Sequence, residues 1–233
     1  MDDELLIIVI LFILFLTITL AIYSYYRNKK WVEALAQYAQ EKGYRFSGKR
    51  DDSLRDTFQA LGLELFQRGH TRRLTNHISG SHRQTSFDLF DYRYTTGSGK
   101  YSHTHLQTVI TFDTIGENNP AFVLRPQGLF DKLAEKFGKK DIDFDLYPEF
   151  SKKYHLTGND VNAIRSVFNS SLIDFFQNVT DIKERSGWSV ESDGKRLVIF
   201  RSGKRCNNIE VLQTFFTQAQ QFMDMISRPR YNL

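Results

Sequence analysis

The longest hydrophobic stretch of the chain lies at its N-terminus. Leu5 to Tyr26 contains no charged residue, and its polar side chains are limited to threonine, serine and tyrosine. As an α-helix it would reach roughly 33 Å, enough to cross a hydrocarbon core about 30 Å thick. A buried helix of a soluble protein usually has a polar face, which this stretch lacks. The pattern therefore predicts a transmembrane helix over residues 5–26, after a short acidic N-terminus at residues 1–4.

A cleaved signal peptide is the main alternative to a retained membrane helix. Signal peptides begin with cations and have a shorter apolar region, whereas this chain begins with Asp2, Asp3 and Glu4. Bulky tyrosines also stand where the small residues of a cleavage site would be expected. The sequence therefore favours an uncleaved anchor.

The residues that follow the span predict its orientation. Three cations lie on this side and only carboxylates on the other, so the positive-inside rule predicts a cytoplasmic C-terminal region. Aromatic rings with a polar edge suit the membrane–water interface. The residues expected at this interface are Tyr23, Tyr25, Tyr26, Arg27, Lys29, Lys30 and Trp31. We expect a single-pass protein of the inner (plasma) membrane.

Short elements of both kinds are predicted in the first part of the soluble region. A juxtamembrane helix covers residues 27–43, and a short strand and a short helix follow at 44–50 and 51–62. Extended segments are predicted at 63–69, 86–95, 102–112 and 121–126. In the segment 102–112, Leu106, Ile110 and Phe112 share one face, and His103, His105 and Gln107 share the other.

Helices predominate in the second part. The pattern predicts helices at 128–138, 158–179 and 207–226, a strand at 141–145, a short turn or helix at 147–154, and a hairpin at 187–201 that turns at Asp193 and Gly194. Because strands come mainly first, an α+β fold with a mainly antiparallel sheet is expected over residues 44–226. A division into two sub-domains near 127–140 is left open, and residues 227–233 form a C-terminal tail.

Three stretches carry a resemblance to a group of uncharacterised bacterial membrane proteins. They are "FVLRP", "DIDFDLYPEFSKKYHLTG" and the helix that begins "NDVNAIRSVF". Proteins of this group have one N-terminal transmembrane helix and a cytoplasmic α+β region. The resemblance implies a fold and a membrane anchor, but no activity.

Composition adds little about function. The chain has 233 residues, a net charge of +4 and 20 phenylalanines. About two hundred residues remain after the span, enough for one domain or two small ones. The single cysteine, Cys206, excludes an intramolecular disulfide and a thiolate metal cluster. Cations precede it and could lower the pKa of its thiol, but no positioned histidine is evident.

Two histidines are the first candidates for chemistry. His103 and His105 alternate on a predicted strand, so both rings project from one face and could occupy two positions of a zinc or copper site. A third ligand could come from His70, His77 or His82. The alternative is a solvated outer face without a metal. On the metal interpretation, the protein would be a membrane-tethered metal-dependent hydrolase that uses His103, His105 and Asp88 or Asp91.

The acidic segment at residues 141–145 begins like a calcium-binding loop. That loop requires a glycine at its sixth position and a carboxylate at its twelfth. Leu146 and Lys152 occupy these positions. The sequence therefore does not support an EF-hand site.

A cluster of basic residues makes the membrane-proximal half positive. For a chain tethered to a bilayer, the simplest partner is the anionic lipid surface, which attracts each nearby cation by about 1 kcal/mol. An ordinary solvated surface is the alternative, and no nucleic-acid-binding motif accompanies the charge. The candidate contacts are Arg68, Arg72, Arg73 and Arg83.

These patterns favour a membrane-anchored protein without a catalytic site or cofactor. No nucleophile elbow, phosphate-binding glycine loop or zinc-protease motif occurs in the sequence. The leading hypothesis is a single-pass protein whose cytoplasmic domain binds a protein partner or the anionic membrane surface.

Overall fold

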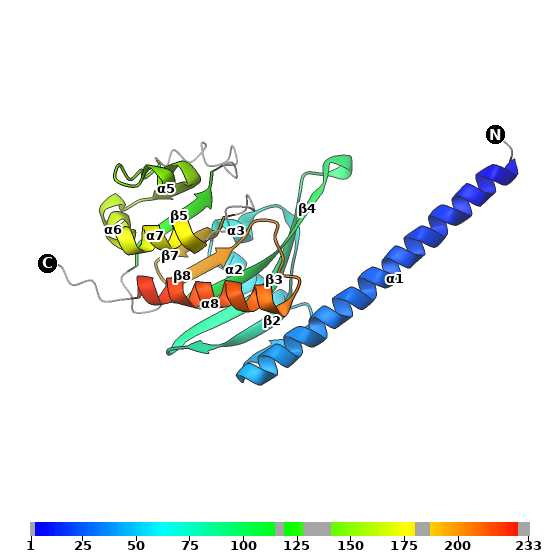
Figure 1. The fold of residues 1–233 in the computed structure, drawn as a ribbon, viewed down its shortest axis with the longest axis horizontal. Coiled ribbons are helices and arrows are strands. Elements are labelled where there is room, and N and C mark those ends of the chain that lie inside the picture. The colour runs from blue at the N-terminus through cyan, green and yellow to red at the C-terminus, as the bar shows by residue number, and fades with distance from the viewer. Residues whose placement is uncertain (1–2, 115–118, 128–140, 180–186, 228–233) are drawn as a thin grey trace.

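The computed structural model describes residues 3–114, 119–127, 141–179 and 187–227. A long N-terminal helix, α1 (Asp3–Lys42), leads into an α+β domain built on one sheet (Figure 1). The predicted fold class is confirmed. The predicted transmembrane and juxtamembrane helices are one unbroken helix, because no glycine or proline interrupts the chain before Gly43.

Eight antiparallel strands form the sheet, in the order β1-β2-β3-β4-β8-β7-β5-β6. Strands from both sides of residues 127–140 therefore belong to the same sheet. Their bounds are β1 (Arg45–Ser47), β2 (His70–His82), β3 (Thr85–Thr96), β4 (His103–Asp113), β5 (Ala121–Pro126), β6 (Tyr154–Gly158), β7 (Ser189–Asp193) and β8 (Arg196–Phe200).

Helices cover both faces of this sheet. On one face, α2 (Asp52–Ala60) and α3 (Glu64–Gln67) enclose a small aromatic cluster that includes Phe58, Phe66 and Phe90. The C-terminal end of α1 and four further helices enclose a larger cluster on the other face. These helices are α5 (Pro148–Lys153), α6 (Val161–Val167), α7 (Ser170–Val179) and α8 (Ile209–Ile226).

The double cover explains the burial of β4. The prediction of one solvated face fails in the middle of this strand, where Gln107 and Val109 are as fully buried as Ile110 on the opposite face. The residues of β4 that point toward α2 and α3 are therefore part of a second core. Only the end of the strand near His103 is exposed.

In the first half, one segment carries no prediction and one was predicted incorrectly. Residues 70–82, for which the sequence predicts no element, form the longest of the described strands, β2. Two register shifts interrupt its alternation, and Thr71 and Asn76 have positive φ angles of 51° and 55°. Residues 64–67, expected to be extended, form the short helix α3 instead.

Two further predictions fail in the second half. The helix expected over residues 158–179 is divided into α6 and α7, because the side chain of Asn169 accepts a hydrogen bond from Leu172 N at 3.1 Å and starts a new helix. Residues 141–145 are not a strand. The backbone bond from Ile142 N to Leu156 O at 2.8 Å, and the contacts of Asp141 with Leu156 N at 2.9 Å and His155 Nδ1 at 2.6 Å, hold this segment beside β6.

Several predictions are confirmed. Helix α8 lies within the range expected for it and is capped by Asn208, and the β7–β8 hairpin turns at Gly194, whose φ is +90°. Helix α5 begins at Pro148 as expected. The helix predicted at 128–138 and the proposed division near 127–140 lie largely outside the described residues.

Candidate functional site at the membrane junction

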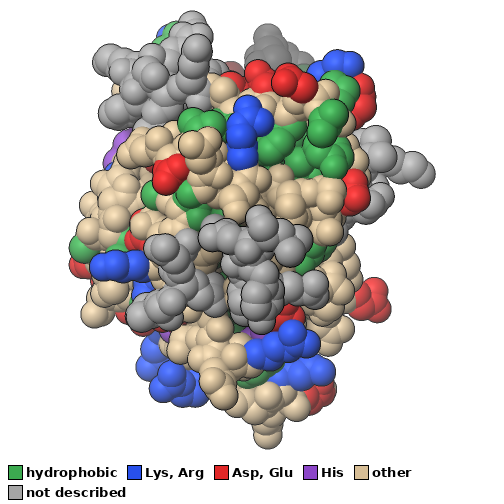
Figure 2. Space-filling model, turned by 90° about the vertical axis from the view of Figure 1, so that its left-hand side faces the viewer, with side chains coloured by type: hydrophobic (Ala, Val, Ile, Leu, Met, Phe, Trp, Pro, Cys, Tyr) green, Lys and Arg blue, Asp and Glu red, His purple; other side chains and the backbone are tan. Residues whose placement is uncertain are grey.

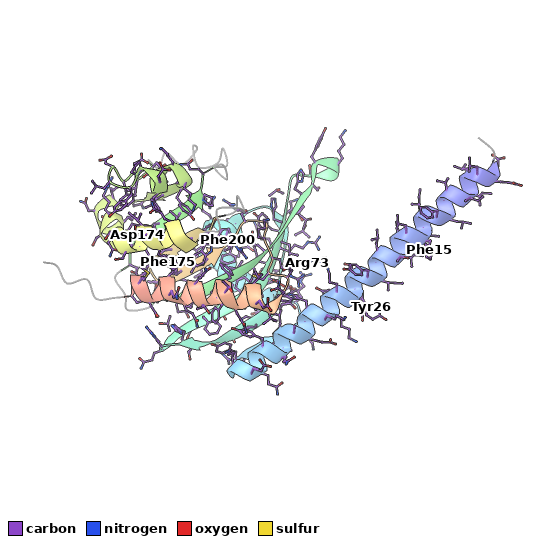
Figure 3. All side chains as sticks on the ribbon, in the orientation of Figure 1. Phe15, Tyr26, Arg73, Asp174, Phe175 and Phe200 are labelled. Atoms are coloured by element: carbon purple, nitrogen blue, oxygen red, sulfur yellow. The ribbon has the colours of Figure 1, made fainter. Side chains whose placement is uncertain are left out.

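Helix α1 has two chemically different parts. Every described side chain before Trp31 is exposed, including the whole apolar run from Leu5 to Tyr26. From there on, Trp31, Leu35, Tyr38 and Ala39 form a buried stripe against the domain. Of the described helices, only α1 is long and apolar enough to cross a membrane. Figure 3 shows Phe15 and Tyr26 on the part of α1 that extends away from the domain.

A buried carboxylate lies at the point where α1 meets the sheet. Asp91, on β3, is only 4% exposed and accepts hydrogen bonds from four segments of the chain. The donors are Trp31 Nε1 on α1 at 3.4 Å, Asn76 Nδ2 on β2 at 2.8 Å, Thr108 Oγ1 on β4 at 3.1 Å and Arg205 Nε at 2.8 Å. We call this group the Asp91 cluster.

Arg205 connects the Asp91 cluster to the helix as it leaves the domain. Its guanidinium lies 5.7 Å from the centre of the Trp31 ring and donates a hydrogen bond to Asn28 Oδ1 at 3.3 Å. It also supplies the positive charge that offsets the buried carboxylate. Asn28 and Trp31 are therefore both linked to β3 through a single arginine.

Cys206 belongs to the same structure and not to a reactive site. Its backbone N–H donates to Thr108 Oγ1 at 2.9 Å, and its side chain is 1% exposed. Burial raises the pKa of its thiol, which outweighs the opposing effects of Thr108 and Arg201. The expectation that neighbouring cations lower this pKa is therefore wrong.

The expected interface residues divide into two groups. Tyr23, Tyr25 and Tyr26 are all more than half exposed, and the guanidinium of Arg27 lies 5.9 Å from the Tyr23 ring. Lys29 lies 4.0 Å from Glu33 one turn further along the helix. Trp31 differs, because its ring is only 8% exposed and packs inside the domain.

The four arginines proposed to contact lipid do not form one patch. Arg83 lies at the β2–β3 turn and pairs with Asp224 of α8 at 2.8 Å. Arg72 donates to the backbone oxygens of Arg68 and Gln67, at 3.1 and 2.6 Å, and so helps to shape the chain before β2. Arg73 is exposed on β2, directly opposite Arg93 of β3.

The histidines are held separately. His105 stacks on Tyr94 at 4.7 Å and bonds Thr96 at 2.9 Å, whereas His103 is exposed at the strand end. The other three bond elsewhere, His70 to Gly97 O, His77 to Asp88 and His82 to Asp224. Among the described residues, no three His, Cys, Asp or Glu side chains are grouped closely enough to hold a metal ion.

The carboxylates proposed to act with these histidines are also distant. Asp91 points to the α1 side of the sheet, whereas His105, directly opposite Tyr94, points to the other side. Asp88 shares the face of His105 but lies six positions along β3 from Tyr94, roughly 20 Å away at about 3.3 Å per residue. The structure therefore does not assemble the hydrolase site considered from the sequence.

A second buried charged group lies on the opposite face of the sheet. Glu191 of β7 is fully buried, accepts a hydrogen bond from Leu65 N at 3.0 Å and contacts Arg125 of β5 at 3.1 Å. Arg125 also pairs with Glu64 at the start of α3. Burial raises the pKa of Glu191 to about 7, although the hydrogen bond from Leu65 opposes this rise.

Sequence reasoning missed the structural roles of Asp91 and Glu191. The signal that could have found them is an acidic residue in the middle of an aromatic or β-branched strand, as in "FDLFDYRY" and "WSVES". Such a carboxylate requires a partner when both faces of the sheet are covered. Its partner, however, is distant in sequence.

Comparisons with known proteins identify the fold alone. No protein-family profile and no curated protein sequence matches the chain. Among solved structures, the chain is similar to the crystal structure of the mycobacterial trehalose monomycolate transport factor A, TtfA. The match has a TM-score of 0.60 and 12% sequence identity, and covers 86% of this chain and 98% of the other. The two proteins share an architecture.

Removing the charge of Asp91 tests the importance of the cluster. Asp91→Asn leaves Arg205 without its carboxylate, and we expect the free energy of unfolding of the full chain in detergent micelles to fall by roughly 3 kcal/mol. Asp88→Asn is the matched control, because Asp88 is half-buried and pairs only with His77 among the described residues. Equal losses for the two variants would contradict a special role for Asp91.

Glu191 predicts a pH dependence of stability. Its folded pKa of about 7 lies above the ordinary value of 4.5, so the folded state holds the proton more tightly. The stabilisation is complete below about pH 4.5 and is lost as the pH rises to about 7. Unfolding free energies measured across this range should fall more steeply for the wild type than for Glu191→Gln. Asp145→Asn, at an exposed position, should keep the wild-type slope, and a Glu191→Gln slope equal to the wild type would refute the assignment.

Proposed function

We propose that this chain is a non-enzymatic, single-pass membrane protein whose cytoplasmic domain binds a partner protein in the same membrane. The observation that carries the proposal is the continuity of α1, whose exposed apolar half leads without a break into the core of the domain. The helix thus serves as the anchor and as part of the domain that it anchors.

The charges beside the span support a cytoplasmic domain. Arg27, Lys29 and Lys30 are all exposed and lie within the first turns after the apolar run. Asp3 and Glu4 occupy the first turn on the other side. Cations close to the end of a span favour the cytoplasmic side of a membrane.

The buried carboxylates have structural roles, which supports a binding function for the domain and not a catalytic one. Asp91 joins α1 to three strands and a loop, and Glu191 joins β7 to β5 and α3. Both carboxylates are thus engaged in holding elements together. The chain is similar in fold to a protein described as a transport factor. We therefore include in the proposal an accessory role in transport at the membrane.

The face of the domain remote from α1 offers a surface for the partner. Figure 2 shows hydrophobic side chains on this face, interspersed with charged ones. Apart from the α1 span and Tyr101 in the β3–β4 turn, the most exposed large hydrophobic side chains of the described residues are Leu146 and Val161. Leu146 is 87% exposed in the turn before α5, and Val161 is 43% exposed at the start of α6. Exposed apolar side chains with charged surroundings are typical of protein-binding surfaces.

The orientation can be measured with single cysteines, because Cys206 is buried and should not react in the folded protein. We expect Glu149→Cys to react with a membrane-impermeant thiol reagent only after the cells are permeabilised. Asp3→Cys should react in intact cells. The reverse pattern would place the domain on the outer side, and release of the chain by alkaline carbonate would show that it is not anchored.

Binding of a membrane partner can be tested by photo-crosslinking in cells. A photoreactive residue at Leu146 or Val161 should give one discrete adduct with an integral membrane protein, whereas the same residue at Glu41 should not. Deleting residues 5–26 should weaken the adduct, because anchoring raises the effective concentration of the two proteins. The same adducts from all three positions would indicate random collision and contradict the proposal.

A further inference from the structure

The hairpin formed by β3 and β4 extends beyond the rest of the sheet. The two strands pair from Phe87 and Phe112 as far as Thr96 and His103, but β8 pairs only with residues Val109 to Asp113 of β4. Among the described residues, no strand therefore pairs with the outer half of β4 on the β8 side. In Figure 1, its tip projects toward the side on which the N-terminal part of α1 leaves the domain.

The Asp91 cluster fixes this hairpin relative to α1. Asp91 belongs to β3 itself and contacts Trp31 directly, and Arg205 ties the same carboxylate to Asn28. Leu35 and Ala39 pack into the core below this point. A bilayer that contains the span therefore faces a defined part of the domain, which includes the hairpin.

Two arginines lie between the hairpin tip and the Asp91 cluster. Arg73 and Arg93 are directly opposite each other on β2 and β3, and both are exposed. Arg93 is two positions from Asp91, so its side chain points to the α1 face of the sheet. Figure 3 shows Arg73 at the end of the sheet near the exposed part of α1. The ion pairs of the described residues include neither Arg73 nor Arg93. Like charges directly opposite each other destabilise a sheet.

The tip of the hairpin carries an exposed aromatic ring and a cation. Tyr101 is 70% exposed, and the ammonium of Lys100 lies 5.2 Å from the centre of its ring. Gly97 and Gly99 allow the tight turn with φ angles of +74° and +55°. At Gly97 a Cβ atom would lie 2.3 Å from the backbone oxygen of Tyr101, so the turn requires glycine there. A tyrosine beside a lysine is well suited to the lipid headgroup region.

We propose that the outer end of the β3–β4 hairpin is a second membrane contact, which rests on the anionic headgroups of the leaflet from which α1 emerges. Tyr101 and Lys100 enter the headgroup region, and Arg73 and Arg93 bind lipid phosphates behind them. The inference rests on the membrane anchoring proposed above. It adds a lipid-binding surface that is separate from the remote face offered to a protein partner.

Geometry and charge both favour lipid as the occupant. The tip of the hairpin projects toward the side on which the exposed part of α1 leaves the domain (Figure 1), which is the side that faces a bilayer holding the span. Guanidinium groups bind phosphate oxygens in a bidentate manner, so a lipid phosphate between Arg73 and Arg93 would relieve their repulsion. The contact is intramolecularly tethered, so it needs little intrinsic affinity.

The test uses the full chain reconstituted into phosphatidylcholine vesicles, with and without anionic phosphatidylglycerol. An environment-sensitive fluorophore is attached at Ser102→Cys, next to the tip, or at Ser81→Cys, at the opposite end of β2. Both serines are exposed, and Cys206 is buried. We expect headgroup spin-labelled lipids to quench the fluorophore at 102 strongly in anionic vesicles and weakly in neutral ones. The fluorophore at 81 should not be quenched in either.

Substitution of the arginines tests the chemistry. Arg73→Gln and Arg93→Gln should each lower the ratio of docked to undocked hairpin, derived from the quenching, by roughly fivefold. Lys195→Gln, at the exposed β7–β8 turn, should leave the ratio unchanged. High salt should reproduce the effect of the arginine substitutions.

Each contrary result has a distinct meaning. An absence of quenching at 102 in a chain that resists carbonate extraction overturns the hairpin contact and leaves the anchor intact. Extraction by carbonate overturns the proposed function itself. Quenching at 102 that is the same in anionic and neutral vesicles, and is unchanged by both arginine substitutions, also rejects the inference. Protection of position 102 in native membranes but not in protein-free vesicles assigns the hairpin to a protein partner and rejects the lipid contact.

Discussion

A carboxylate that is removed from water must be compensated, and the compensation of Asp91 determines how the two parts of the molecule are joined. Its four donors come from α1, β2, β4 and the loop that carries Arg205. These segments meet in space only when the sheet is complete and α1 is docked against it. The charge therefore makes the docking of the helix and the pairing of the strands depend on each other.

Much of the fold could be predicted from the sequence because its signals are local. The apolar run of α1, the cap at Asn208 and the turn at Gly194 each specify their own element. The failures arose where a local irregularity hides the pattern or where distant residues decide the outcome. The bulges of β2 disguise its alternation, and the cap at Asn169 divides a pattern that reads as one helix. Helices α2 and α3 bury a face of β4 that its sequence suggested was solvated.

Less of the candidate site was accessible to sequence reasoning. The tyrosines and cations after the span are contiguous, so they could be recognised as a membrane boundary. Asp91 and Arg205 are separated by 114 positions, and no local pattern connects them. Arg73 and Arg83 are ten residues apart and read as one basic cluster, but the length of β2 carries them to its opposite ends. The two arginines are close in sequence but far apart in the structure, because a long strand lies between them.

The uninterrupted helical backbone between Tyr26 and Trp31 has a consequence for how this protein can evolve. A helix turns by about 100° per residue, so insertion of one residue in this link would rotate the whole domain by about 100° about the helix axis relative to the residues of the span. Insertion of seven residues would nearly restore its azimuth, while lifting the domain by about 10 Å. The number of residues between Tyr26 and Trp31 therefore sets both the rotation of the domain about the helix axis and its distance from the bilayer.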